Sequence, residues 1–345
     1  MDSFTQIALG ATVAEVGFRK QLGGRAVLWG GFCGLVPDLD IALVALDPWN
    51  EIIHHRGASH SFLMLTLFTP LFGWLGAKIG KGRGTWKTWS HLSFWSLVTH
   101  PMLDIFTSFG TQVFWPITNR RYAWDGASIV DPVYTLPLLV VLVLALKRGD
   151  PPRWRRRFSA VVLGLTTAYL VFGTAMMSIA KSRAEAQLAE NGFEATHLRV
   201  LPAIGTNLLF RVVARDVGSA RRIGYVSVLS DQPIRFACAD SDDSERAAEL
   251  LDSKGGRIFN WFADELLLLR NVDGEMQLVD LRFGTPRTPI STLFAFTTHN
   301  GTLPLARMSR PTIQLGEELG SIWTALRDGW SGECDETFAQ APSSP

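Results

Sequence analysis

Long apolar runs alternate with short polar segments through the first half of the chain. The longest runs cover residues 26–46, 62–77, 130–146 and 158–180. A membrane-spanning helix needs roughly 17–25 mostly apolar residues, so runs of this length predict transmembrane helices. Residues 3–18 and 89–106 are less hydrophobic and complete a predicted bundle of about five to six helices.

The pattern changes after residue 180. A polar segment, KSRAEAQLAENG, predicts a helical linker, and the segments after it alternate polar and apolar residues between Gly, Asp and Pro. Such alternation is typical of half-buried antiparallel strands. The strands are predicted at residues 207–216, 222–230, 275–282 and 289–298, with a helix at 243–254. The predicted fold is therefore an α-helical polytopic membrane domain (1–180), a smaller α+β, β-rich soluble domain (181–335) and a disordered tail (336–345).

Basic residues predict how the bundle is oriented. Lys and Arg cluster in residues 19–25, 78–87 and 147–157, and connections rich in these residues normally face the cytoplasm. This threading places the N-terminus and the residues beyond 180 on the side opposite the cytoplasm. Lys181 and Arg183 oppose that assignment.

Charge and cysteine content narrow the function further. The net charge is +1, so no global basic field indicates nucleic acid as a partner. The three cysteines show no CxxC spacing, so neither a zinc ribbon nor a disulfide framework is indicated. A disulfide between Cys238 and Cys334 would form only if the C-terminal half lies outside the cytoplasm.

The densest polar motif, HHRGASHS, spans residues 54–61 and holds three of the seven histidines. A neutral imidazole is the commonest ligand of transition metals. His55 and His60 are five residues apart, and Gly57 between them lets the chain bend so that both can face one ion. Arg56 would clamp an anionic substrate such as a phosphoester, although an arginine that reaches to the membrane interface explains it equally well.

Two further pairs could supply more ligands. Asp38 and Asp40 would share one side of an extended stretch, which suits a mixed nitrogen and oxygen site for zinc, manganese or iron, but a simple polar turn also explains them. His100 and Asp104 would lie one helical turn apart and could bind one ion together. A buried His–Asp pair in a kinked helix is the alternative for them.

The predicted topology brings these pairs to one membrane face. Asp38 and Asp40 end the second helix, the histidine motif precedes the third, and His100 and Asp104 end the fourth. Gln6, Asp2 and Asp131 fall at the same face. Ionisable residues at membrane depth are costly, so such a cluster predicts a functional site.

Several motifs in this order resemble one family. MDSFTQIALGATVAEV, VPDLD, HHRGASHS, THPMLDIFTSFGTQVFWPI and IVDPVYTLPLL together are similar to the YdjM/YbcI-like inner-membrane proteins, described as membrane-bound metal-dependent hydrolases. The resemblance covers residues 1–180 and implies a bacterial membrane protein with a His/Asp metal site. A distant similarity of the family to zinc-dependent phospholipase C suggests phosphoester hydrolysis.

The resemblance also implies particular ligands. The residues that match the family's polar motifs are Asp38, Asp40, His55, His60, His100 and Asp104. The motif H-R-G-x-S-H favours His55 over His54. Many relatives have Thr-His where this chain has Thr5-Gln6, so one histidine ligand is missing or is replaced by an amide oxygen.

Two hypotheses of function follow. The first is a membrane-bound hydrolase of ester or phosphoester lipids or lipid-linked compounds, which uses a water activated by a divalent metal, zinc before manganese or iron. Asp38 or Asp104 would be the general base, and Arg56 would stabilise negative charge. The second is a non-enzymatic membrane regulator or scaffold with a structural metal and a protein partner on residues 181–335. A transporter fits less well, because transporter sites normally lie at the membrane midplane.

Overall fold

The computed structural model describes the chain except for residues 46–48, 148–151, 291–293, 299–314, 333 and 335–345. The chain folds into two compact units. The first contains Met1–Val44 and His54–Thr174, and the second contains Ala45–Ile53 and Ala175–Pro345. The predicted disordered tail lies outside the described residues, as does part of the strand predicted at 289–298.

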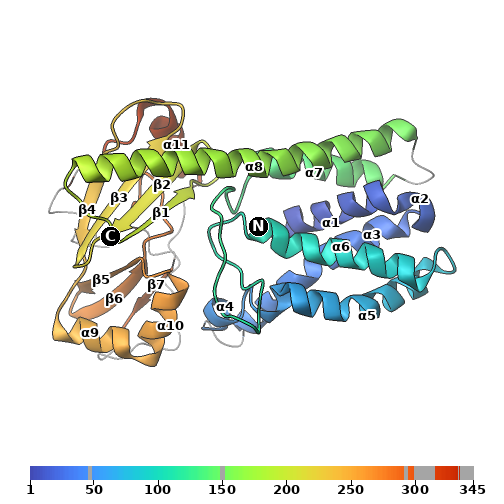
Figure 1. The fold of residues 1–345 in the computed structure, drawn as a ribbon, viewed down its shortest axis with the longest axis horizontal. Helices are drawn as coiled ribbons and strands as arrows, with labels where there is room; N and C mark the ends of the chain where they lie inside the picture. Colours follow the sequence, from blue (N-terminus) through green and yellow to red (C-terminus); the bar gives the residue numbers. More distant parts are fainter. Residues whose placement is uncertain (46–48, 148–151, 291–293, 299–314, 333, 335–345) are drawn as a thin grey trace. The chain divides into compact units, whose positions relative to one another are not determined.

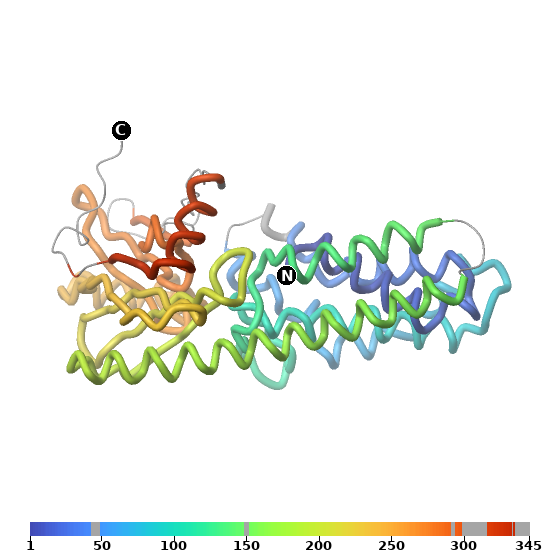
Figure 2. Tube along the Cα trace, turned by 90° about the horizontal axis from the view of Figure 1, so that it is seen from above, coloured from blue at the N-terminus to red at the C-terminus, as the bar shows by residue number. Residues whose placement is uncertain are grey.

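Helices build the first unit, and several of them pack lengthwise (Figures 1 and 2). Its elements are α1 (Ser3–Gly17), α2 (Arg19–Leu22), α3 (Arg25–Leu35), η1 (Val36–Ala45), η2 (Ala58–His60), α5 (Phe62–Gly80), α6 (Trp86–Asp104), α7 (Pro132–Ala145) and the first part of α8 (Arg153–Glu190). The runs at 62–77 and 130–146 therefore correspond to α5 and α7, the run at 26–46 is divided between α3 and η1, and the run at 158–180 lies in α8, which continues into the second unit.

Polar side chains fix where the helices begin. The Asp2 carboxylate accepts a hydrogen bond from the backbone N–H of Thr5, and the Ser61 hydroxyl accepts one from Met64. Asp131 accepts two from the start of α7. Such N-caps satisfy N–H groups that have no partner within the helix. Because Ser61 caps α5, the helix starts directly after His60.

Glycines allow α1 and α3 to pack closely. A Cβ atom on Gly34 would lie 2.4 Å from the carbonyl oxygen of Gln6, and one on Gly10 would lie 2.3 Å from that of Gly30. Small residues at such positions let helix backbones approach, as in membrane proteins. This contact sets the distance between Gln6 on α1 and the end of α3.

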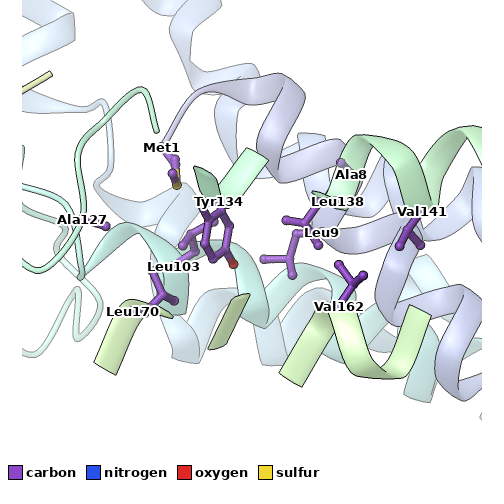
Figure 3. Packing of buried hydrophobic residues seen from close by; sticks show 10 residues of the cluster. All are labelled: Met1, Ala8, Leu9, Leu103, Ala127, Tyr134, Leu138, Val141, Val162 and Leu170. Atoms are coloured by element: carbon purple, nitrogen blue, oxygen red, sulfur yellow. The ribbon is translucent and has the colours of Figure 1, made fainter. Parts of the chain in front are cut away.

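A buried apolar cluster joins the other helices to α1. Leu9 of α1 packs with Leu103 of α6, Leu138 of α7 and Leu170 of α8 (Figure 3). Met1 also lies in this cluster, 3% exposed. The cluster therefore positions the last turn of α6 against the start of α1.

The outward faces of the first unit are strongly apolar. Leu67 of α5, Leu136 of α7 and Leu165 of α8 are 66%, 60% and 66% exposed. Among the described residues, α5 and α8 are long and apolar enough to cross a membrane, and only 22% of the most apolar window of each is buried. Exposed apolar faces of this extent mark surfaces that contact a membrane or a partner. The full set of five to six spans remains a prediction.

Two antiparallel sheets form the second unit, in the orders β1-β2-β3-β4 and β5-β6-β7. The strands are β1 (His197–Pro202), β2 (Leu209–Arg215), β3 (Ala220–Ser227), β4 (Phe236–Asp240), β5 (Leu267–Val272), β6 (Glu275–Asp280) and β7 (Ala295–Thr297). This confirms the prediction of a helical region followed by a sheet-rich domain.

The first sheet is covered on both faces. Phe210 of β2 shares a core with Ala184 in the second part of α8, whereas Val213 of the same strand shares one with Leu268 of β5. Side chains an odd number of residues apart point to opposite faces of a strand, so β2 is buried from both sides. The remaining helices are α9 (Glu245–Asp252), α10 (Lys254–Phe262) and α11 (Leu315–Asp328).

Two features tie distant segments into the second unit. Cys238 of β4 forms a disulfide with Cys334. Residues 45–53, which carry α4 (Trp49–Ile53), fold with this unit although they precede the histidine motif in sequence. The Trp49 ring stacks on Phe296 at a centroid distance of 4.6 Å. The chain therefore passes through the second unit directly before His54.

Candidate metal centre

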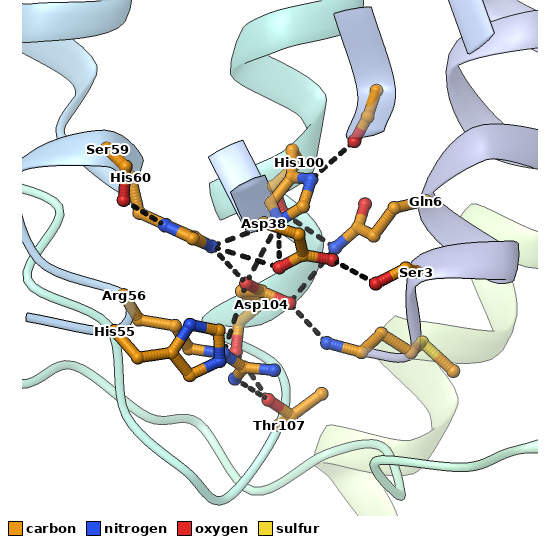
Figure 4. A network of polar contacts seen from close by, with 12 residues as sticks. Ser3, Gln6, Asp38, His55, Arg56, Ser59, His60, His100, Asp104 and Thr107 are labelled. Atoms are coloured by element: carbon orange, nitrogen blue, oxygen red, sulfur yellow. Dashed lines mark hydrogen bonds and ion pairs between the residues drawn. The ribbon is translucent and has the colours of Figure 1, made fainter. Parts of the chain in front are cut away.

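Three segments carry the predicted ligands of the first unit. Asp38 and Asp40 lie on η1. His55 precedes η2 and His60 ends it, and Asp104 ends α6 one turn after His100. Figure 4 shows that side chains from these segments point toward one another. The structure thus brings together predicted ligands that are as far apart in sequence as Asp38 and Asp104, which both lie beside Nε2 of His60 and of His100.

Four of these residues form a tight inner group. Asp38, His60 and His100 each offer one ligand atom within 4.8 Å of the others. Nε2 of His60 lies 3.0 Å from Nε2 of His100, and Oδ1 of Asp38 lies 3.6 and 3.3 Å from these two nitrogens. Oδ2 of Asp104 lies 3.3 and 3.4 Å from the same nitrogens. All four side chains are buried.

Hydrogen bonds define which nitrogen of each imidazole carries its proton. Nδ1 of His100 lies 2.6 Å from the carbonyl oxygen of Gly34, to which it can only donate. The Ser59 hydroxyl donates to Asp40, so it accepts from Nδ1 of His60, 3.0 Å away. The neutral form of each ring therefore has its lone pair on Nε2. These two lone pairs face each other across the centre of the group.

The inner group fits a small divalent cation. Four ligands that surround one ion tetrahedrally at about 2.0–2.2 Å are themselves about 3.3–3.6 Å apart. Four of the separations within the group run from 3.3 to 3.6 Å, and the two imidazole nitrogens are 3.0 Å apart. Oδ2 of Asp104 is buried and has no hydrogen-bond partner among the described residues, although Nε of Arg56 lies 3.3 Å from it as an ion pair. Imidazole nitrogen and carboxylate oxygen suit zinc, manganese or iron.

The outer atoms of the ligands are held in place. The Ser3 hydroxyl donates to Oδ2 of Asp38 at 2.7 Å, and the Gln6 amide donates to Oδ1 of Asp104 at 3.0 Å. The Met1 ammonium donates to the same oxygen of Asp104. Such contacts leave the other carboxylate oxygen free to face an ion. Gln6, whose role the sequence left open, thus contacts a ligand residue through its amide nitrogen.

Asp40 and His55 form a second polar group beside His60. Nδ1 of His55 lies 2.8 Å from Oδ1 of Asp40, and Oδ2 of Asp40 lies 3.4 Å from Nδ1 of His60. The expectation that Asp38 and Asp40 share one side of an extended stretch is wrong. They lie on a 3-10 helix, which has about three residues per turn, so side chains two positions apart point in different directions.

These carboxylates determine the charge of His60 when no ion is bound. Burial lowers the pKa of His60, but hydrogen bonds with Asp104, Asp38 and Asp40 outweigh burial and raise that pKa to about 10. Burial raises the pKa of Asp40, whereas its hydrogen bonds with His55 and His60 bring it well below the usual range. The group therefore attracts a positive charge, whether a proton or a metal ion.

Arg56 lies against the inner group. Its Nε is 3.3 Å from Oδ2 of Asp104, its Nη1 donates to the Thr107 hydroxyl at 2.7 Å, and its guanidinium lies over the Phe109 ring at 5.0 Å. Its φ angle of 59° places it in the left-handed region. Arg56 is only 3% exposed, so its guanidinium is buried against the inner group instead of reaching out of the protein.

The other polar residues predicted at this face have different roles. His54 is exposed. Asp2 and Asp131 cap helices, and Asp131 also accepts a hydrogen bond from the Tyr169 hydroxyl at 2.9 Å. The sequence reasoning missed Ser3 and Gly34. Ser3 could have been found from its position one helical turn before Gln6 on α1. The backbone carbonyl of Gly34 could not, because a backbone contact leaves no signal in the sequence.

A helical unit with outward apolar faces and a buried His/Asp group at the ends of its helices defines a membrane protein with a candidate metal centre. The chain belongs to the YdjM inner membrane protein family, whose profile matches residues 1–180. This confirms the family that the motifs resemble and assigns the protein to the inner membrane. No curated protein and no solved structure is significantly similar to the chain.

Proposed function

We propose that the protein is a metal-dependent hydrolase of the inner membrane. The observation that carries this proposal is the close approach of Nε2 of His60 to Nε2 of His100, 3.0 Å apart and beside two carboxylate oxygens. Such a group of acceptors is unfavourable without a cation at its centre. Asp38, His60 and His100 would hold the ion, and three protein ligands are typical of catalytic sites.

The ion, when bound, supplies a Lewis acid and lowers the pKa of water toward neutrality. Asp104 is the residue that takes up the proton, because its Oδ2 faces the two imidazoles while Gln6 and the Met1 ammonium hold its Oδ1. Arg56, 3.3 Å from the same oxygen, stabilises negative charge that develops on an ester or phosphoester. Asp38 acts as a ligand in this assignment instead of the base.

The substrate class follows from the position of the site. The inner group lies where α5 begins and α6 ends, and α5 is a candidate membrane span. A group at the end of a span lies near the depth of the lipid headgroups, so a lipid or a lipid-linked ester is the substrate that we propose. The Cys238–Cys334 disulfide supports a periplasmic location of the second unit, because disulfides persist in oxidising compartments.

One observation favours a second function. Oδ2 of Asp104 is as close to the imidazoles as Oδ1 of Asp38 is, so Asp104 could complete a closed set of four ligands. Structural sites are closed in this way, whereas catalytic sites keep an open position. The protein would then be a membrane regulator or scaffold whose ion only stabilises the fold, with a partner bound by the second unit.

Asp104→Asn distinguishes the two functions. The detergent-solubilised protein is loaded with zinc, manganese or iron, and metal content is measured by elemental mass spectrometry. Hydrolysis of bis-p-nitrophenyl phosphate and of a p-nitrophenyl acyl ester is followed in parallel. We expect Asp104→Asn to keep the ion and lose hydrolysis, and His60→Ala to lose both.

His91→Ala is the matched control for these variants, because His91 is an exposed histidine on the same helix as His100. It should change neither metal content nor activity. A wild-type protein that binds one ion tightly but hydrolyses neither ester, with metal lost in Asp104→Asn, would reject the hydrolase and favour the closed structural site.

A further inference from the structure

The segment between α6 and α7 folds into a small hairpin over the histidine motif. Thr111 and Tyr122 pair through two backbone hydrogen bonds of 3.0 and 2.9 Å, and we call residues 111–122 the 111–122 hairpin. Its chain reverses near Phe114, whose carbonyl oxygen accepts from the N–H of Ile117 at 2.9 Å. The hairpin is short and is held by its neighbours.

Backbone contacts attach the 111–122 hairpin to the segment that carries the metal ligands. The Gln112 N–H donates to the carbonyl oxygen of Arg56 at 2.9 Å. The Phe62 N–H donates to that of Val113 at 3.0 Å, and the Ser61 hydroxyl donates to that of Trp115 at 2.5 Å. These bonds lie on both sides of His60. The 111–122 hairpin and the His60 segment are therefore held together, so the position of the hairpin relative to a membrane would also fix that of the metal group.

The tip of this hairpin exposes apolar side chains. Ile117 is 81% exposed and Phe114 is 45% exposed, and Trp124, two residues after the hairpin, is 49% exposed. A soluble loop at this position would normally carry polar residues. Exposed apolar clusters of this kind mark surfaces that contact a membrane or a partner.

The composition and position of the tip favour a lipid bilayer over a protein partner. The Phe114 ring contacts the Phe62 ring at 6.2 Å, so the tip is continuous with the outward face of α5, where Leu63 is also exposed. Arg120 is exposed and lies over the Tyr122 ring at 5.4 Å. Aromatic residues beside arginine are typical of the membrane–water interface, where rings sit at headgroup level and guanidinium binds phosphate.

We infer that the tip of the 111–122 hairpin inserts into the headgroup region of the bilayer on the side where α5 begins. The hairpin is an interfacial anchor, and it holds the His60 segment at the depth of the lipid headgroups. This inference goes beyond the proposed function, because the anchor is needed equally by a hydrolase and by a protein whose ion is structural.

The experiment places one environment-sensitive probe at the tip. An NBD fluorophore is attached to Ile117→Cys in the full chain, reconstituted in phosphatidylcholine–phosphatidylglycerol vesicles. Cys33 is buried and Cys238 and Cys334 form a disulfide, so the introduced thiol is the one available for labelling among the described cysteines. Val217→Cys is the matched control, because Val217 is an exposed aliphatic residue of the second unit, 88% exposed.

We expect the probe at residue 117 to emit at shorter wavelength than the one at residue 217. Lipids with a spin label near the headgroup should quench it several times more strongly. Equal emission and equal quenching at the two positions would overturn the inference. A blue-shifted probe that the spin-labelled lipids do not quench would also overturn it, since a protein would then cover the tip. Neither outcome depends on metal or hydrolysis, so the proposed function is tested separately.

Discussion

The first unit contains two buried polar clusters, and their charged groups are compensated in different ways. The first lies between α1, α7 and α8, where the Glu15 carboxylate accepts from Arg19 at 3.2 Å and from Arg155 at 3.0 Å. The two guanidinium groups also donate to the carbonyl oxygens of Ala145 and Leu144. The carboxylate contacts both guanidinium groups, and backbone carbonyls accept from each of them, although Nη2 of Arg155 has no hydrogen-bond partner among the described residues. The charges of this cluster therefore compensate one another without a bound ion.

The His/Asp cluster lacks this balance at its centre. Its inner atoms are Nε2 of His60 and of His100 and one oxygen each of Asp38 and Asp104, which all accept when both rings are neutral. Their donors lie on the outside, from Ser3 and from Gln6 among others. Among the described residues, the one cationic side chain beside the inner atoms is Arg56, whose Nε lies 3.3 Å from the Asp104 oxygen. A buried polar cluster whose donors face outward and whose acceptors face inward has room for one cation. Burial alone therefore does not identify a metal site; the direction of the hydrogen bonds does.

Removing the carboxylate of the balanced cluster should have the largest effect on stability. Glu15→Ala leaves Arg19 and Arg155 buried without a counter-charge, and breaking a buried ion pair in this way costs about 3–5 kcal/mol. Thermal unfolding in detergent measures the loss, and metal content of the folded fraction should stay unchanged. Glu185→Ala is the control, since Glu185 pairs with Lys181 at an exposed site, where pairs contribute about 0–1 kcal/mol. Equal effects of the two variants would contradict the comparison.

Removing the metal should affect only the second cluster. An ion present at about 100 times its dissociation constant stabilises the folded state by about 2.7 kcal/mol. A chelator should therefore lower the melting temperature of the wild type. It should not change that of His100→Ala, because this variant has already lost a ligand. The measurement is differential scanning fluorimetry with and without the chelator. The same decrease in both proteins would mean that the chelator acts elsewhere.

The sequence predicted the helices well because apolar run length is a local property. The run at 130–146 became α7 (Pro132–Ala145), and the one at 62–77 became α5 (Phe62–Gly80). The second unit was harder. The strands β2, β6 and β7 fall within predicted segments and β3 overlaps one, but β1, β4 and β5 were missed. β5 opens with three consecutive buried leucines, so the alternation that reveals a strand is absent there.

The residue types of the candidate site could be predicted from the sequence, but the directions of its side chains and hydrogen bonds could not. His60, His100 and Asp38 were chosen because histidine and aspartate are metal ligands, and the structure gathers them within 4.8 Å. The sequence could not show that residues 36–45 form a 3-10 helix, which turns Asp40 toward His55. It also could not reveal the Gly34 carbonyl, which fixes the proton on His100.

Asp40 tests whether the outer donors and acceptors matter for the inner group. In Asp40→Asn the side chain keeps its shape but loses the charge beside Nδ1 of His60, 3.4 Å away. Changing such a supporting residue typically lowers metal affinity about 10–100-fold. Titration with a competing chromophoric chelator measures the change. Asp131→Asn is the control, because Asp131 is a buried helix cap outside the group. Complete loss of metal in Asp40→Asn would instead make Asp40 a ligand, as first predicted.

A change of one pH unit should alter metal affinity less than the substitutions above do. Hydrogen bonds with Asp104, Asp38 and Asp40 outweigh burial and raise the pKa of His60 to about 10, so the metal-free protein carries a proton there at neutral pH. An ion must displace this proton. Affinity should therefore rise by about tenfold per pH unit between pH 6 and 9 and level off above the raised pKa.

The stability of the metal-free protein should change in the opposite direction. A pKa raised in the folded state adds stability that is complete below the ordinary histidine value and is lost as the pH rises toward 10. Melting of the metal-free wild type should thus shift to lower temperature across this range, while the metal-loaded protein should not show this shift. His60→Ala removes the titrating group and should abolish the difference. An affinity that is constant between pH 6 and 9 would mean that His60 carries no proton in the metal-free protein. That result would contradict the raised pKa of His60.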